Sequence, residues 1–450
     1  MRKLVSKPSD VLEGAVGLFW PFAEPSDIRN EPMRGYVQLR EQRWIVLDAL
    51  DERPLMSFLD VRDSVDNWPR SIAGATSEAG VLLLNQKFSS AQTRIGGSKA
   101  STAHYRFRTI VVGVILDRLK SPRVRGVRGS FPEGLEWAGM RAVTERHQYL
   151  GDGSHRVGKL TIELDGRGQE IVFAPSKGIQ VELKPTWAVV SGSDESRSIT
   201  TALLVQCTSS RPLPIDELSG YIDAVRCLLW LCHGRIVECD LGGALPHYAP
   251  STDQTWSELW DDRLMERSSI SIPPRSSARS RSALVTLSDL GGAKAIRRWV
   301  RFYRGHGRMV GPLLHGFRLA GRVPVESRLL ELAAAIEYYV GYSRKTSKRW
   351  ASDLHRNRAL ANHSSQACRN WMGDVETWAE ALYETNNTIK HNPSISVDPL
   401  RTLLLVQSAE VLIACVALDE VAGSRRPSTR YIADHHIQEL GQRLRTELGV

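Results

Sequence analysis

The sequence predicts an α+β protein with a β-rich N-terminal half and a helical C-terminal half. Up to about residue 210, short apolar runs rich in β-branched residues alternate with Gly- and Asp-rich turns, which is typical of antiparallel strands. From residue 288 onward, apolar residues recur at helical spacing instead. A chain of 450 residues exceeds one ordinary core, so two or three domains are expected.

The N-terminal pattern favours a mostly antiparallel, β-sandwich-like domain that also carries a helix. The expected strands are 35–39, 43–47, 80–84, 109–116, 160–164, 170–173, 179–183 and 200–207, with a short helical insert at 130–145. Pro214 then opens a helix whose apolar stripe runs from Leu218 to Cys232, and Gly234 ends it. Segment 236–239 can form a further strand, and the polar stretch 268–282 is expected to be an exposed linker or loop.

The C-terminal half predicts a helical bundle. Helices are expected at 326–341 and around Trp371–Leu382, and the last core helix begins at Asp398 and Pro399 and stops at Gly423. Its apolar surface is broad, so it is either buried or meets a second copy. The expected domains are 10–245 (β-rich), 246–324 (linker and basic bridging helix), 325–425 (helical) and 426–450 (C-terminal helix).

The sequence lacks the motifs that are typical of several classes of protein. The six cysteines lack paired zinc spacing and are expected to be buried free thiols, and no GxxxxGK, GxSxG or HExxH motif occurs. We therefore expect no metal and no other cofactor. The absence of an export signal or an apolar run of about 20 residues predicts a cytoplasmic protein without membrane contact.

The positive charge is concentrated in one region. Segment 293–370 holds sixteen Lys and Arg against four acidic residues, within a chain of net charge +9. This imbalance indicates contact with a polyanion, most commonly RNA or DNA, although a solvated basic surface would show the same pattern.

A candidate acid/base site lies in segment 381–393. Asn387 and His391 are four residues apart, so a helix would place them on one face. Pro393 cannot continue a helix, so His391 is expected near a helix end that solvent can reach. Glu337 lies beside the apolar face of its own helix, where it needs a partner or a wet cleft, unless it is a boundary residue that reaches solvent.

The order of these parts resembles the ApeA family of bacterial antiphage proteins. Glu13–Trp20, Gly35–Leu39 and Thr200–Gly234 are similar to its N-terminal domain, and residues 325–422 are similar to its HEPN ribonuclease domain. The resemblance implies abortive infection by a metal-independent endoribonuclease that cuts RNA, with tRNA as a candidate substrate. It also implies a homodimer or higher homo-oligomer formed through the HEPN domain, a β-rich half that senses infection, and a phage-derived trigger.

The family's motif falls on Asn386–His391. Asn387 and His391 match it, while Asn386 stands where the family usually has Arg, and Lys390 could supply the missing cation. A looser second match places Arg356 or Arg358 before His363. The basic segment supplies the residues expected to contact RNA, namely Arg344, Lys345, Lys348, Arg349, Arg356, Arg358 and His363.

Two other hypotheses remain open at this point. The helical domain could bind RNA without cutting it, as an inactive HEPN regulator, because the motif lacks its Arg. Alternatively, the chain could be a ligand-binding β-sandwich with a helical dimerisation domain and no nucleic-acid role.

Overall fold

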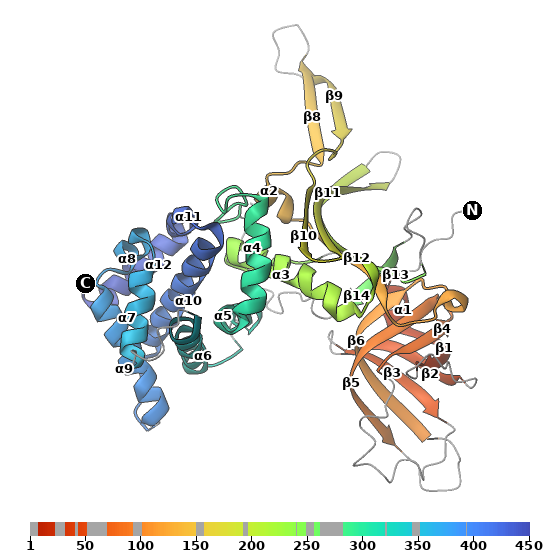
Figure 1. Ribbon diagram of the computed structural model, residues 1–450, viewed down its shortest axis with the longest axis horizontal. Coiled ribbons are helices and arrows are strands. Elements are labelled where there is room, and N and C mark those ends of the chain that lie inside the picture. Colours follow the sequence, from red (N-terminus) through yellow and green to blue (C-terminus); the bar gives the residue numbers. More distant parts are fainter. Residues whose placement is uncertain are drawn as a thin grey trace.

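The fold was analysed in a computed structural model. It describes residues 8–22, 32–40, 44–51, 70–92, 101–149, 157–191, 197–239, 241–248, 256–261, 282–319, 322–343, 352–392 and 394–450. An antiparallel β-rich part leads into a helical part that begins at residue 293 (Figure 1), so the predicted α+β class is confirmed. Most of the stretch expected as a loop, 268–281, lies outside the described residues.

Twelve of the described strands form one sheet in the order β10-β11-β12-β7-β13-β14-β6-β3-β2-β1-β4-β5. Their bounds are β1 Glu13–Pro21, β2 Met33–Arg40, β3 Trp44–Asp51, β4 Ile72–Thr76, β5 Gly80–Gln92, β6 Ser101–Val112, β7 Val124–Phe131, β10 Ile171–Ser176, β11 Ile179–Ser191, β12 Arg197–Leu213, β13 Leu241–Pro246 and β14 Ser257–Asp261. The remaining two, β8 (Val143–Tyr149) and β9 (Val157–Leu164), pair only with each other and project as a hairpin (Figure 1).

The sheet closes on itself at one end. Strand β5 also pairs with β6, which makes β6-β3-β2-β1-β4-β5 a six-stranded barrel, and the other six strands continue from β6 as an open curved sheet. Short alternating strands are common to β-sandwiches and β-barrels, so their pattern alone did not distinguish two stacked sheets from one closed sheet.

Two further segments differ from the prediction. Strand β14 joins this sheet although its sequence lies in the stretch expected to be a linker. Segment 236–239, for which a strand was considered, forms none.

The inside of the barrel is apolar. Val37, Leu47 and Phe107 are fully buried there, and helix α1 (Pro8–Leu12) adds Val11 to the same cluster. Alternate residues of each strand therefore face outward, as the two-residue period requires.

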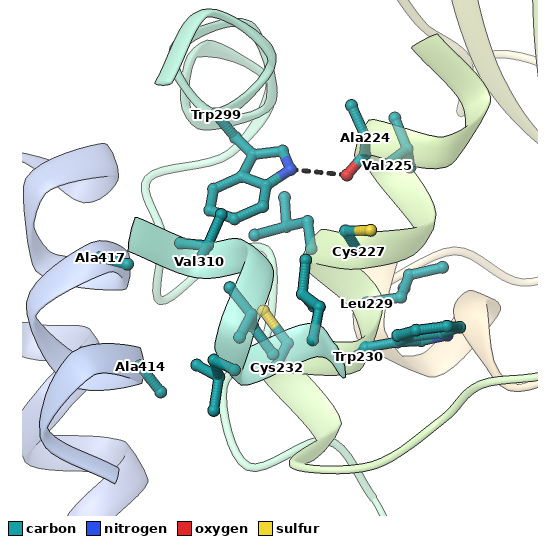
Figure 2. Close-up of a cluster of buried hydrophobic side chains, with 14 of the residues drawn as sticks. Ala224, Val225, Cys227, Leu229, Trp230, Cys232, Trp299, Val310, Ala414 and Ala417 are labelled. Carbon is teal, nitrogen blue, oxygen red and sulfur yellow. Dashed lines mark hydrogen bonds between the residues drawn. The ribbon is translucent and has the colours of Figure 1, made fainter. Parts of the chain in front are cut away.

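Helix α3 (Ile215–His233) joins the two halves. It begins after Pro214 and ends at Gly234, whose φ of 63° is the left-handed conformation that glycine adopts readily, as the sequence predicted. The helix packs on β7 and β12 and also contacts α4 (Ala293–Gly305), where Trp299 Nε1 donates to the Ala224 carbonyl at 2.6 Å (Figure 2). Val310, Ala414 and Ala417 belong to the same apolar cluster, so one core runs from the sheet into the bundle.

The bundle surrounds helix α10 (Pro399–Ala422). Asp398 caps its N-terminus by accepting from the Leu400 amide at 2.8 Å, and Gly423 ends it at φ 69°, as predicted. This helix is long and apolar enough to cross a membrane, but 83% of its most apolar window is buried inside the fold. The other bundle helices are α5 Gly307–Leu319, α6 Val325–Glu337 with the π-helical turn Tyr338–Ser343, α7 Asp353–His363, α8 Gln366–Met372, α9 Val375–His391, α11 Arg426–Ile432 and α12 His435–Leu448.

Two expected elements differ in detail. The insert expected at 130–145 is a single-turn helix, α2 (Gly134–Ala138), followed directly by β8, and Gly139 at φ 69° ends that turn. The C-terminal helix expected over 426–450 is two helices, α11 and α12, because Asp434 caps a new helix by accepting from the His436 amide at 3.0 Å.

All six cysteines are free and buried, which confirms the prediction of buried thiols. Burial raises the pKa of Cys207, Cys227 and Cys232 to about 12 in each case, so these thiols stay protonated and unreactive near neutral pH.

Candidate functional site

The candidate site lies at the C-terminal end of α9. Asp374 caps the start of the helix by accepting from the Thr377 amide at 2.8 Å, and His391 is the last helical residue. The imidazole of His391 is exposed to solvent, and Asn387, one turn earlier, is half-buried. An exposed imidazole at a helix end can reach a large ligand without rearrangement of the fold.

Asp353, the first residue of α7, holds the neighbouring groups of α9. Its Oδ2 accepts from Asn386 Nδ2 at 3.3 Å and from Lys390 Nζ at 3.2 Å, while its Oδ1 accepts from Arg356 Nη1 at 2.8 Å. The sequence pattern did not indicate this role. Asp353 follows Ser352 at a helix start, which predicts only a local stabilising charge.

The same network extends to α6. Arg356 Nη1 also lies 3.1 Å from Glu337 Oε1, so Glu337, Arg356, Asp353 and Lys390 form a chain of alternating charge across three helices. The Glu337 side chain is 55% exposed, which makes it a boundary residue with an ion-pair partner. The positive charges near His391 are therefore held in place by carboxylates.

Asn386 occupies a different environment from its neighbours. It is 1% exposed and lies inside the contact between α7 and α9, and among the described residues its Oδ1 has no hydrogen-bond partner. The position at which the resemblance expects a cation thus holds a buried amide. Asn386 positions α9 against Asp353, and the cations that Asp353 holds near the helix end are Lys390 and Arg356.

In the second motif match, Arg358 lies in the middle of α7 and His363 at the end away from Asp353. Arg358 pairs with Glu376 and with Glu380, at 3.0 Å to the latter, near the start of α9. His363 Nε2 lies 3.1 Å from Glu420 Oε1 on α10. Helices α7 and α9 are therefore antiparallel, and the rise of an eleven-residue helix places His363 about 15 Å along the axis from Asp353. The structure does not bring His363 to His391.

Much of the basic segment is used inside the fold. Arg298 Nη1 donates to the carbonyls of Val421 and Ala422 at 2.9 and 2.7 Å, and Arg328 pairs with Glu331 and Glu410 at 2.6 Å each. Lys294, Arg297 and Arg301 remain on the exposed face of α4. The predicted RNA contacts Arg344, Lys345, Lys348 and Arg349 lie outside the described residues.

Other features lie away from this helix end. A pocket of about 470 Å³ is lined by α2, β8 and β12, with Leu135, Met140 and Ile199 among its walls. In the part of the chain that the structure describes, no three His, Cys, Asp or Glu side chains gather in a way that could hold a metal ion.

The comparisons with known proteins support one assignment. The family model described as ApeA N-terminal domain 1 matches residues 15–246, which is more than half of the chain and covers the barrel, α3 and the open sheet except for β14. No curated protein and no solved structure matches the chain.

Proposed function

The chain belongs to the ApeA family, and from this premise we propose that it is an antiphage defence protein whose helical half is a metal-independent HEPN-type endoribonuclease. The single observation that supports the enzyme assignment most strongly is the exposed His391 at the end of α9, with Asn387 one turn before it. We place the protein in the cytoplasm, where RNA is available, and its trigger among products of an infecting phage.

The chemistry follows from the groups at the helix end. The imidazole of His391 can remove the proton of a ribose 2′-hydroxyl or, in its protonated form, give a proton to the leaving 5′-oxygen. The 2′-oxygen then attacks the adjacent phosphorus, the bond to the 5′-oxygen breaks, and a 2′,3′-cyclic phosphate and a 5′-hydroxyl remain. No external oxidant, reductant or metal enters this balance.

The cation in this proposal is Lys390, with Arg356 behind it. Asp353 holds both side chains at the helix end, so their positive charge is in place before a phosphate arrives. Positive charge fixed in advance stabilises the negative charge that develops on the phosphate oxygens. Asn387 can bind the sugar or the phosphate from the same face.

We further propose that the active form is a homodimer or a higher homo-oligomer in which two helical domains bring their helix ends together. Apolar side chains on the surface near the start of α10 suit such a contact. Ile395, Leu400 and Leu403 are 58%, 46% and 40% exposed and follow His391 closely in the chain. The β-rich half would then sense the trigger and restrain or release the bundle.

The test compares His391→Ala with His436→Ala, a second exposed histidine, on α12. We expect His391→Ala to abolish RNA cleavage and toxicity in expressing cells, whereas His436→Ala keeps both. Cleaved RNA should carry a 5′-hydroxyl and a 2′,3′-cyclic phosphate, and cleavage should survive EDTA. Equal activity of the two variants, or a requirement for a divalent ion, would remove this assignment.

One observation favours a second function, an HEPN regulator that binds RNA without cutting it. The buried Asn386 replaces the family's Arg, and Lys390 is already paired with Asp353. In that case both histidine variants would bind RNA as the parent does, and no cyclic phosphate ends would appear.

A further inference from the structure

The outside of the barrel carries an ordered polar row. Tyr36, Asp48 and His104 pair directly across β2, β3 and β6, and the residues that alternate with them, such as Val37 and Leu47, are fully buried inside. The two-residue period of a strand therefore places all three side chains on the outer face.

Asp48 organises this row. Although it lies on the outside, it is only 5% exposed, because Gln38 Nε2 donates to its carboxylate at 3.0 Å, Arg40 Nη2 at 2.7 Å, and His104 Nδ1 contacts its other oxygen. Burial alone would raise the pKa of Asp48, but the hydrogen bonds from His104 and Tyr36 and the charge of Arg40 outweigh it and lower the pKa. The carboxylate thus fixes the orientation of three neighbouring side chains.

The surroundings of this row are basic and aromatic. Strands β2 and β6 contain no acidic residue, while they contribute Arg34, Arg40, Arg106 and Arg108. Tyr36 is 39% exposed, and the Arg108 guanidinium lies 5.9 Å from the centre of the Trp44 ring, on the strand between. We call this surface the outer barrel face. Its members are Arg34, Tyr36, Arg40, Trp44, Asp48, His104, Arg106 and Arg108.

We propose that the outer barrel face binds single-stranded nucleic acid. Arginine side chains on neighbouring strands suit successive phosphates, and an exposed tyrosine among them suits the face of an unpaired base. A duplex offers its phosphates but keeps its base faces stacked inside, so the aromatic component favours single strands. This site belongs to the β-rich half and does not depend on RNA cleavage at His391.

Binding of a fluorescently labelled DNA single strand of about 12 nucleotides, within the usual range of site sizes, tests the proposal in the full chain by anisotropy. DNA lacks the 2′-hydroxyl, so cleavage through a cyclic phosphate cannot interfere, and failure here leaves the ribonuclease proposal untouched. We expect Tyr36→Ala to weaken binding by about 5-fold or more, because it removes one stacked base. Tyr36→Phe should retain the affinity, and Tyr149→Ala, at a 60% exposed tyrosine of the β8–β9 hairpin, is the control.

The contribution of the arginines is measured separately, through the salt dependence of binding. Arg34→Gln should lower the slope of log affinity against log salt by about 0.7, the value for one phosphate contact on a single strand, whereas Tyr36→Ala should leave the slope unchanged. Arg167→Gln, whose side chain is 94% exposed in a turn, is the matched control. Thermal unfolding of each variant confirms that it is folded.

Two further binding measurements distinguish a single strand from a duplex and from a mononucleotide. A duplex of the same length should bind without loss in Tyr36→Ala, and a mononucleotide should compete only weakly. The proposal is overturned if Tyr36→Ala and Arg34→Gln both bind within twofold of the parent, if Tyr149→Ala loses as much as Tyr36→Ala, or if the mononucleotide competes as well as the strand.

Discussion

Replacement of Asp353 by Asn should destabilise the fold by about 1–2 kcal/mol. The variant removes two partly exposed ion pairs, to Arg356 at 2.8 Å and to Lys390 at 3.2 Å, and each such pair contributes about 0.2–1 kcal/mol. It also removes a negative charge from the first turn of α7, worth about 0.3–1 kcal/mol. The new amide can still accept from Asn386, so the buried side chain keeps its partner.

Urea unfolding measures this loss as the change in the free energy of unfolding. Asp434→Asn is the matched control, because Asp434 also sits at a helix start, caps α12 through its side chain and has no ion pair among the described residues. Asparagine caps as well as aspartate, so the control should lose less than about 1 kcal/mol. At 1 M salt the difference between the two variants should shrink, since ion pairs are screened. Equal losses, or a difference that salt does not change, would refute the ion-pair network.

The same variant also tests the place of Asp353 in the proposed site. Loss of its charge removes the carboxylate that competes with phosphate for Lys390 and leaves Arg356 paired with Glu337, so RNA binding should become tighter at low salt. A matched Asp434→Asn protein should bind as the parent does. Weaker binding by Asp353→Asn would mean that the two cations do not face the RNA.

Three further predictions concern the core and the barrel. Trp299→Ala should lower the free energy of unfolding by about 3–5 kcal/mol, because a fully buried indole is lost. The sheet and the bundle should still unfold in one urea transition. Two separate transitions would contradict the continuous core. Gly441→Ala should cost about 1–3 kcal/mol in the same assay, since a Cβ would lie 2.3 Å from Trp371 Nε1, whereas Gly307→Ala, with nothing within 4 Å, is the control. The pKa of Asp48 is lower in the folded protein than in the unfolded chain, where it is near 4, so its charge stabilises the fold above that pH. This stabilisation is lost as the pH falls through the native pKa. The acid unfolding of Asp48→Asn should therefore depend less on pH below 4.

Features set by neighbouring residues could be predicted from the sequence. Pro214 and Gly234 bound α3, and Asp398 and Gly423 bound α10, because caps act within one turn of the helix end. The apolar breadth of α10 likewise predicted a helix that is either buried or in contact with a second copy of the chain, and the structure places it inside the bundle.

Features set by distant residues could not be predicted in the same way. Barrel closure depends on the pairing of β5 with β6, for which alternation gives no register. Asp353 meets Lys390 across 37 positions of sequence, and Asn386 is buried only because α7 packs on it. The basic segment shows the same limit, since charge counts do not distinguish Arg298, which binds the end of α10, from the exposed Arg301.

The continuous core bears on how the two halves can communicate. Trp299 of α4 hydrogen-bonds to Ala224 of α3 (Figure 2). Arg298, the preceding residue on α4, donates to the last carbonyls of α10. One helix therefore touches both the helix that lies on the sheet and the central helix of the bundle. A close-packed core of this kind has low compressibility and transmits displacement. We therefore expect a ligand that shifts the sheet to move α3 and α4 together, and the end of α10 with them.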